Sequence, residues 1–214
     1  MSVTTNAVKK TEVRRTTNVR MLAQIAMLSA VAAVLMLVEV PLPFLAPTFY
    51  QLDLSELPVL IGAFALGPLA GMMIEMVKIL LNFVLNGTLT AGVGELANFL
   101  IGCALVVPAG YIYKRGKTKK SALIGMSVGT ICMALAGGIL NAFLLLPAYG
   151  KAFVMPVDAF VEMGSAIFPV IDDLLTFCLF SVVPFNMVKG ILVSVITMFL
   201  YKHISRLLKG NQMG

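Results

Sequence analysis

The sequence predicts an all-α membrane protein with six transmembrane helices, both termini in the cytoplasm and a ligand pocket that opens outward. The first observation is composition: of 214 residues, 59% are hydrophobic and only 12% charged, with a mean hydropathy of +0.97. A soluble domain of this length does not bury so much apolar surface. The second is a series of apolar stretches long enough to cross a bilayer. The third is that basic residues flank these stretches on one side.

The net charge of +6 and the pI of about 9.3 do not indicate a nucleic-acid partner. The lysines and arginines flank apolar stretches, so membrane topology explains them better. Cys103, Cys132 and Cys178 lie in apolar stretches without CxxC spacing or a neighbouring histidine. We therefore expect neither a disulfide framework nor a metal site.

Met21 to Val38 is the first predicted span. Small side chains recur within it at Ala23, Ala26, Ala30 and Ala33, on one helical face. Such a strip allows another helix to approach closely. The alternative is that alanine is simply common in membrane helices, and the pattern leaves both interpretations open.

Residues 39–53 form a predicted outer loop with three prolines, which disfavour a helix. Its apolar content is too high for a loop that merely lies in water, so we expect it to fold back over the helices. The segment Thr48, Phe49, Tyr50 and Gln51 is suited to lining the mouth of a pocket. Packing onto neighbouring helix ends is the alternative.

The apolar stretch from Leu54 to Asn86 is too long for one ordinary span and is interrupted at Gly67-Pro68. We predict two shortened helices, at about 55–66 and 69–85, joined by a tight turn. Glu75 and Lys78 lie three residues apart in the second helix, which favours an internal ion pair over a role in ligand binding.

A small-residue turn at 87–94 precedes a predicted span at 95–113. Glu95 and Asn98 lie one turn apart at its start, where they either face a cavity or, for Glu95, cap the helix. The basic segment 114–120 contains Gly-Lys-Thr, but Tyr111 stands where a Walker loop requires glycine. We therefore predict a cytoplasmic loop there and no nucleotide site.

Two further spans are predicted at 121–146 and from about 172 to 201, with an outer segment at 147–168 between them. Asn141 lies in the first, and Asn186 and Lys189 lie one turn apart in the second. A lysine at the middle of a span costs roughly 2.5–3.5 kcal/mol to insert. Lys189 therefore requires either an internal carboxylate partner or a ligand, and the spacing alone does not decide between them.

The distribution of basic residues supports this topology. With both termini inside, 13 of the 16 lysines and arginines are cytoplasmic: residues 9, 10, 14, 15, 20, 114, 115, 117, 119, 120, 202, 206 and 209. The predicted organisation is a basic cytoplasmic segment at 1–20, one transmembrane domain at 21–208 and a cytoplasmic tail at 209–214. Asn141, Asn186 and Lys189 then converge in the outer half.

Two amides, one ammonium and an aromatic lid suit a flat, mostly apolar small molecule with a polar edge. A carboxylate or phosphate ligand would also suit the ammonium. An intramembrane enzyme is disfavoured because Asp172, Asp173, Glu95 and His203 form no catalytic constellation, so no catalytic residue is assigned. A stand-alone secondary transporter would require coupling carboxylates, and Glu75 is already matched with Lys78.

The sequence resembles the substrate-binding S components of energy-coupling factor (ECF) transporters, and among them the riboflavin-specific branch, over nearly its whole length. The resemblance rests on Ala26-xxx-Ala30 and on four segments: Phe49-Tyr50-Gln51-Leu52-Asp53 leading into Glu56-Leu57-Pro58, Gly92-Val93-Gly94-Glu95-Leu96-Ala97-Asn98-Phe99, Gly138-Ile139-Leu140-Asn141 and Pro184-Phe185-Asn186-Met187-Val188-Lys189-Gly190. The last two are the most specific.

The resemblance implies a six-helix protein of the bacterial plasma membrane that binds riboflavin as its transported ligand, without a cofactor or an ATPase of its own. It implies a transmembrane T component and two cytoplasmic ATPases as partners, with Ala26 and Ala30 docking on the T component. Asn141, Asn186 and Lys189 would bind the flavin ring, and the first outer loop would close the site. An S component for another small vitamin-like ligand is the alternative. The outer segment 147–168 is longer than is usual in the family.

Overall fold

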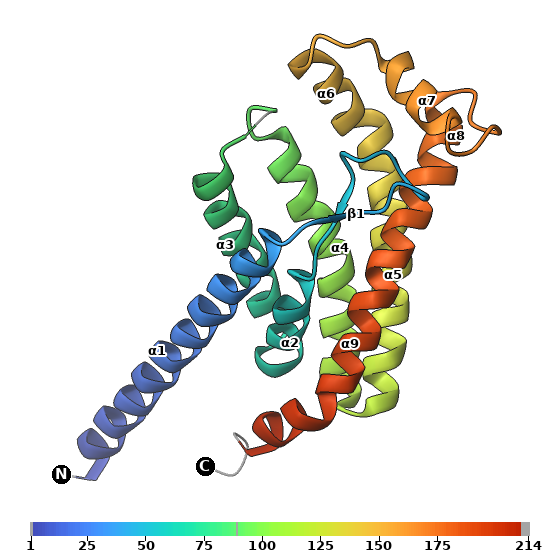
Figure 1. Ribbon diagram of the computed structural model, residues 1–214. Coiled ribbons are helices and arrows are strands. Elements are labelled where there is room, and N and C mark those ends of the chain that lie inside the picture. Colours follow the sequence, from blue (N-terminus) through green and yellow to red (C-terminus); the bar gives the residue numbers. More distant parts are fainter. Residues whose placement is uncertain (1, 89, 211–214) are drawn as a thin grey trace.

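The computed structural model describes the backbone of residues 2–88 and 90–210 and the side chains of residues 19–88 and 90–200. The end of the predicted tail and the basic side chains before residue 19 lie outside these ranges. The helices are α1 (Ser2–Met36), α2 (Glu56–Leu66), α3 (Pro68–Asn86), α4 (Val93–Gly116), α5 (Lys119–Leu140), α6 (Leu146–Ala152), α7 (Val157–Ser165), α8 (Leu174–Phe177) and α9 (Val183–Gly210) (Figure 1). Single π-helical turns at Asn141–Leu145 and Cys178–Val182 join α5 to α6 and α8 to α9.

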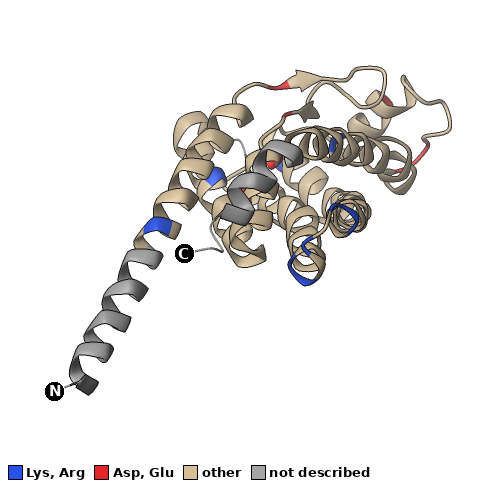
Figure 2. Cartoon of the chain, turned by 90° about the horizontal axis from the view of Figure 1, so that it is seen from below, with Lys and Arg blue, Asp and Glu red and all other residues tan. Residues whose placement is uncertain are grey.

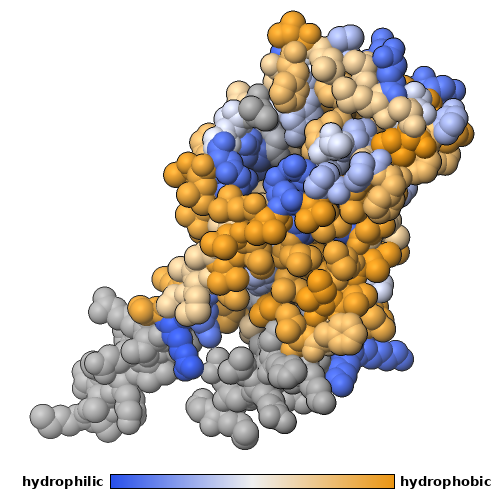
Figure 3. Space-filling view, viewed as in Figure 1, coloured by the Kyte–Doolittle hydropathy of each residue, from blue (hydrophilic) through white to orange (hydrophobic). Residues whose placement is uncertain are grey.

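Five helical stretches within the described residues are long and apolar enough to cross a membrane: Val19–Met36, Pro68–Asn86, Val93–Gly116, Lys119–Ala152 and Leu174–Leu200. The apolar helix α2, with 11 residues, is shorter than this. Most of the described ribbon carries no charged residue (Figure 2). An apolar band also crosses the middle of the visible surface, with hydrophilic residues above and below it (Figure 3). The prediction of a mostly helical chain is confirmed, and five of the six predicted spans are matched by helices of membrane-spanning length and composition.

The predicted turn at Gly67-Pro68 is confirmed, because α2 ends and α3 begins there. Gly67 has φ of 104°, a conformation that glycine adopts without strain, and Pro68 occupies the first turn of α3, where its missing N–H costs nothing. The ion pair within α3 is also confirmed: Lys78 Nζ lies 2.7 Å from Glu75 Oε1.

The predicted end of the fifth span at Leu146 is wrong. The helix continues through Pro147 to Ala152. A π-helical turn directly precedes α6, and Pro147 therefore lies in the first turn of α6. At this position the proline removes fewer backbone hydrogen bonds than it would in the middle of a helix. The rest of the predicted outer segment is also partly helical, as α7.

Two two-residue strands bracket the outer loop between α1 and α2. β1 (Val40–Pro41) pairs antiparallel with β2 (Gln51–Leu52), with Val40 opposite Leu52. The pairing closes the loop on itself, and the loop runs from the end of α1 towards α9, with α6 and α7 above it in the view (Figure 1). Leu52 and Ala46 pack on Phe185 of α9 beneath it. The expectation that this loop folds back over the helices is therefore confirmed.

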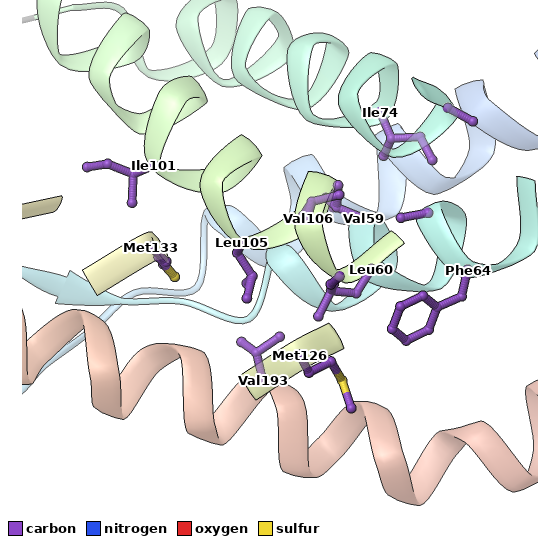
Figure 4. Packing of buried hydrophobic residues seen from close by; sticks show 14 of the residues in the cluster. Val59, Leu60, Phe64, Ile74, Ile101, Leu105, Val106, Met126, Met133 and Val193 are labelled. Atoms are coloured by element: carbon purple, nitrogen blue, oxygen red, sulfur yellow. The ribbon is translucent and has the colours of Figure 1, made fainter. Parts of the chain in front are cut away.

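The main hydrophobic core joins all the long helices, with Leu60, Ile74, Leu105, Met126 and Val193 at its centre (Figure 4). Close packing of α4 on α5 depends on glycines. A Cβ on Gly129 would overlap the carbonyl oxygen of Leu105, and one on Gly125 would lie 2.8 Å from that of Ala109. The glycines therefore allow the two backbones to approach within contact distance.

Candidate ligand-binding pocket

A cavity of about 320 Å³ lies beneath the outer loop, between α4, α5 and α9. Its lining mixes apolar and polar groups, as in pockets for small organic molecules. The lining residues are Met36, Glu39, Phe49, Tyr50, Gln51, Asp53, Gly94, Asn98, Ile101, Met133, Asn141, Leu145, Tyr149, Phe185, Asn186 and Lys189.

Lys189 reaches this cavity from α9 and forms an ion pair with the outer loop. Its Nζ donates to Asp53 Oδ2 at 2.7 Å, and both side chains are buried. The sequence required either a carboxylate partner or a ligand for Lys189. Asp53 is such a carboxylate partner. Lys189 also lines the cavity, so a contact with a ligand remains compatible with the ion pair.

Asp53 is held in its ionised form by its surroundings. Burial alone would raise the pKa of its carboxyl, but the ammonium groups of Lys189 and Lys78 and hydrogen bonds from Lys189 and Ser55 lower that pKa to about 2. The second oxygen, Oδ1, accepts from the Ser55 backbone N–H at 2.8 Å, just before α2. One carboxylate thus connects the outer loop, the start of α2 and α9.

Asn141 occupies the first position of the π-helical turn after α5, and its side chain is buried. Its Nδ2 donates to the carbonyl oxygen of Gly137 at 2.8 Å, and its Oδ1 accepts from the Tyr50 hydroxyl at 2.6 Å. Asn141 therefore ties the outer loop to the end of α5, as Asp53 ties that loop to α9. Burial raises the pKa of the Tyr50 hydroxyl, which stays protonated as a donor.

Asn186 faces the same cavity from α9, one turn before Lys189. Its Nδ2 donates to the Val182 carbonyl at 2.9 Å, within the π-helical turn that precedes α9. The amide lies against the backbone of α5: a Cβ on Gly137 would lie only 2.6 Å from Asn186 Nδ2. Gly137 therefore leaves the space in which this amide lies.

An aromatic wall closes the cavity on the side of the outer loop. The ring of Tyr50 lies 5.7 Å from that of Phe185 and 4.6 Å from that of Phe49, measured between centroids. The ring of Phe49 in turn lies 6.2 Å from that of Tyr149. The planes of neighbouring rings are tilted by 40° to 60°, and together the rings offer an apolar surface beside the polar groups of α5 and α9.

The structure brings together most of the residues predicted for the site. Asn141, Asn186, Lys189, Phe49, Tyr50, Gln51 and Asn98 all line the cavity. Thr48 is exposed and does not line it. Glu95 lines a second cavity next to the first, where Glu95 Oε2 accepts from the Thr88 hydroxyl at 3.0 Å.

Ala26 and Ala30, predicted for docking on a partner, lie on the exposed face of α1, together with Ala23. Ala33 is buried instead, so the strip of alanines does not continue on that face to its end. No side chain within the described residues 19–88 and 90–200 covers Ala26 or Ala30, so both are exposed on the surface of α1.

Sequence reasoning missed several lining residues, above all Asp53, Glu39 and Tyr149. Asp53 stands in one of the segments that carry the family resemblance, but the sequence assigns it no role in the site. A lysine inside an apolar span signals that a carboxylate partner exists somewhere, but the spacing within α9 does not identify which one. The partner lies 136 residues away in the chain.

A second buried ionic cluster lies behind Asp53. Lys78 Nζ lies 2.8 Å from Glu56 Oε1 and 2.7 Å from Glu75 Oε1, and all three side chains are almost fully buried. The same ammonium donates to the Ser55 hydroxyl at 3.2 Å. None of the three charged residues lines the pocket. The cluster joins α2 to α3 and supports the segment that carries Asp53.

A larger groove of about 600 Å³ lies between α5 and α9, lined by side chains such as Met126, Ile131, Ile191 and Phe199. Among the described residues, the polar side chains that line it are those of Ser127, Thr130 and Ser194. A ligand with a hydrogen-bonding edge has far fewer partners there than in the cavity that contains Asn141, Asn186 and Lys189.

Comparison with known proteins gives one consistent family. Residues 20–201 match the family described as the substrate-specific component of ECF transporters. The riboflavin transporter RibU of Staphylococcus aureus is 36% identical over 188 residues, covering 88% of this chain and 92% of the relative. The riboflavin transporter FmnP of Bacillus subtilis is 32% identical over 179 residues, covering 83% and 88%. A solved structure of the S component of a bacterial ECF transporter is similar, with a TM-score of 0.69, 35% identity and coverage of 90% of this chain and 99% of that one.

Proposed function

Because this chain belongs to the substrate-specific components of ECF transporters, we propose that it binds riboflavin and serves riboflavin uptake as the S component of such a transporter. The similarity to riboflavin transporters of two bacteria supports this assignment and a location in a bacterial cell membrane. Riboflavin is the transported ligand here, not a cofactor. In this role the chain is a transport subunit and catalyses no reaction of its own.

The observation that carries the proposal is that Asn141, Asn186 and Lys189 line one cavity beside an aromatic wall. The edge of the flavin ring presents both donors and acceptors, which an amide matches with its own donor and acceptor. Lys189 donates to a ring carbonyl or nitrogen, while its pairing with Asp53 keeps the ammonium neutralised. The flat ring packs on Tyr50 and Phe185.

The proposed topology has six membrane segments, with both termini inside and the pocket facing outward. The 13 basic residues assigned to the cytoplasmic side support this orientation. Helix α2 serves as the sixth segment by packing on α3, although it is too short to cross alone. Residues 21–208 form the transmembrane domain, flanked by cytoplasmic segments at 1–20 and 209–214.

The energising partners are a transmembrane T component and two cytoplasmic ATPases. Transport against a gradient requires energy, and the sequence contains no Walker loop at its only Gly-Lys-Thr segment. Ala26 and Ala30 on the exposed face of α1 provide the docking surface for the T component, because small side chains let a second helix approach closely.

The test is spectroscopic. The detergent-purified protein is expected to show a flavin absorption spectrum or, after removal of bound ligand, to quench the fluorescence of added riboflavin. Asn186→Ala should weaken binding about 5- to 150-fold, the equivalent of leaving one buried polar atom of the ligand unpaired at about 1–3 kcal/mol. Glu162→Gln, on the exposed face of α7, is the matched control.

Failure of riboflavin to bind to the folded wild-type protein would overturn the ligand assignment and leave an S component for another small vitamin-like ligand. Riboflavin uptake that needs no T component or ATPases and follows a proton gradient would instead favour a stand-alone secondary transporter.

A further inference from the structure

A second cavity of about 250 Å³ adjoins the main pocket. The two share Met36, Glu39, Gly94, Asn98 and Tyr149 in their linings. The second cavity lies among the end of α1, the end of α3 and the start of α4. A ligand whose ring lies against Asn141, Asn186 and Lys189 can therefore extend a side chain past Asn98 into this space.

The lining of the second cavity is rich in hydrogen-bonding groups. Asn82, Asn86 and Asn98 contribute amides, and Glu39 and Glu95 contribute carboxylates. Asn86 Nδ2 donates to Asn82 Oδ1 at 2.9 Å, which leaves further donor and acceptor positions on both amides. Hydroxyl groups both donate and accept, so this lining suits the chain of hydroxyls that riboflavin carries on its ring.

The charge of the combined cavity is negative. Its ionisable lining consists of the carboxylates of Glu39, Asp53 and Glu95 and the ammonium of Lys189, which sum to −2 with all four ionised. The ammonium already pairs with Asp53. Among the described residues, neither Glu39 nor Glu95 has a salt-bridge partner. Neither carboxylate is therefore held in an ion pair, although the Lys189 ammonium acts on Glu39 from a longer distance.

We propose that Glu39 and Glu95 make the site selective for the uncharged flavin against its phosphorylated form, flavin mononucleotide. This inference rests on the proposed function. The phosphate of flavin mononucleotide stands at the end of the hydroxyl chain and carries about −1.5 to −2 charges at pH 7. A chain that enters the second cavity brings that phosphate towards two carboxylates, and like charges placed side by side oppose binding.

The test compares two dissociation constants, for riboflavin and for flavin mononucleotide, by fluorescence quenching of the purified full chain at low ionic strength, where screening is weak. The wild type is expected to bind flavin mononucleotide at least about tenfold more weakly than riboflavin. Glu39→Gln and Glu95→Gln should each reduce this ratio, by about threefold or more, and the double variant should reduce it further. The variants Glu39→Asp and Glu95→Asp keep the charge and should retain most of the ratio.

The control is Glu162→Gln, which removes the same charge from the exposed face of α7 and lines neither cavity. It should leave both constants unchanged. Equal affinities for the two flavins in the wild type, or a ratio that both glutamine variants leave unchanged, would overturn the selectivity role while the riboflavin assignment stands. Absence of riboflavin binding in the wild type would overturn the proposed function, and this inference with it.

Discussion

Lys189 and Asp53 lie 2.7 Å apart, although 136 residues separate them in the chain. The pair joins α9 to the end of the outer loop, and both groups are buried. Removing one partner leaves an uncompensated charge in a low-dielectric environment, whereas removing both does not.

We therefore predict that Asp53→Asn lowers the free energy of unfolding by about 2 kcal/mol and Lys189→Met by about 3–5 kcal/mol, and that the double variant loses less than the sum. Unfolding of the purified proteins in detergent, analysed as a double-mutant cycle, measures this coupling. Glu162→Gln again serves as the surface control. Strictly additive losses would show that the pair does not act as a unit.

Gly137 provides a test of how Asn186 is positioned. In Gly137→Ala, the new Cβ would lie 2.6 Å from Asn186 Nδ2, so the amide must move and riboflavin affinity should fall about tenfold or more. In the neighbouring variant Gly138→Ala, the Cβ would meet only Val183 Cγ2, at 2.8 Å. Both variants should lose some stability, about 1–3 kcal/mol. Equal losses of affinity in the two would contradict the role of Gly137.

Tyr50→Phe keeps the aromatic ring but removes the hydroxyl that donates to Asn141 at 2.6 Å. The buried amide oxygen then lacks that partner, at a cost of about 1–3 kcal/mol. We expect a lower midpoint of thermal unfolding without ligand. Added riboflavin should raise that midpoint less than in the wild type if Asn141 must be held in place to bind. Tyr111→Phe, at an exposed site on α4, is the control.

Substitutions in the cluster around Lys78 should differ in how much stability they cost, depending on whether they remove the cation or one carboxylate. Lys78→Met leaves Glu56 and Glu75 facing each other without a cation and should lower the free energy of unfolding by about 3–5 kcal/mol or prevent folding. Glu75→Gln leaves one ammonium with one carboxylate, at 2.8 Å, and should cost far less. Expression level and thermal unfolding distinguish the two. A milder effect of Lys78→Met than of Glu75→Gln would refute this account.

The free energy of unfolding should also depend on pH, because Asp53 is protonated in acid. Its pKa falls from 3.8 to about 2 in the folded protein, since neighbouring ammonium groups outweigh its burial. The ionised carboxylate thus contributes about 2 kcal/mol at neutral pH, and this contribution is lost as the pH falls from about 4 to 2. The difference in thermal unfolding between wild type and Asp53→Asn should therefore shrink steadily from pH 4 to pH 2.5. A constant difference would contradict the assignment.

Features that depend on neighbours in sequence were predictable, and features that depend on distant contacts were not. The turn at Gly67-Pro68 and the Glu75–Lys78 pair follow from local spacing and are both present. The sequence indicated that Lys189 needs a partner but not that the partner is Asp53, because loop-to-helix contacts leave no periodic signal. The helix that continues through Pro147 depends on a π-helical turn, which the residue pattern did not indicate.

The buried contact of Lys78 with Glu56 also has a consequence for biogenesis. Helix α2, with 11 residues, is only about 16 Å long, roughly half the thickness of the hydrocarbon core. Neither α2 nor α3 can hide its ionic groups from lipid alone, and the one-residue connection at Gly67 gives them no room to separate. Entry into the bilayer as a preformed hairpin, released from the translocation machinery as one unit, is therefore the favoured route of assembly for this part of the protein.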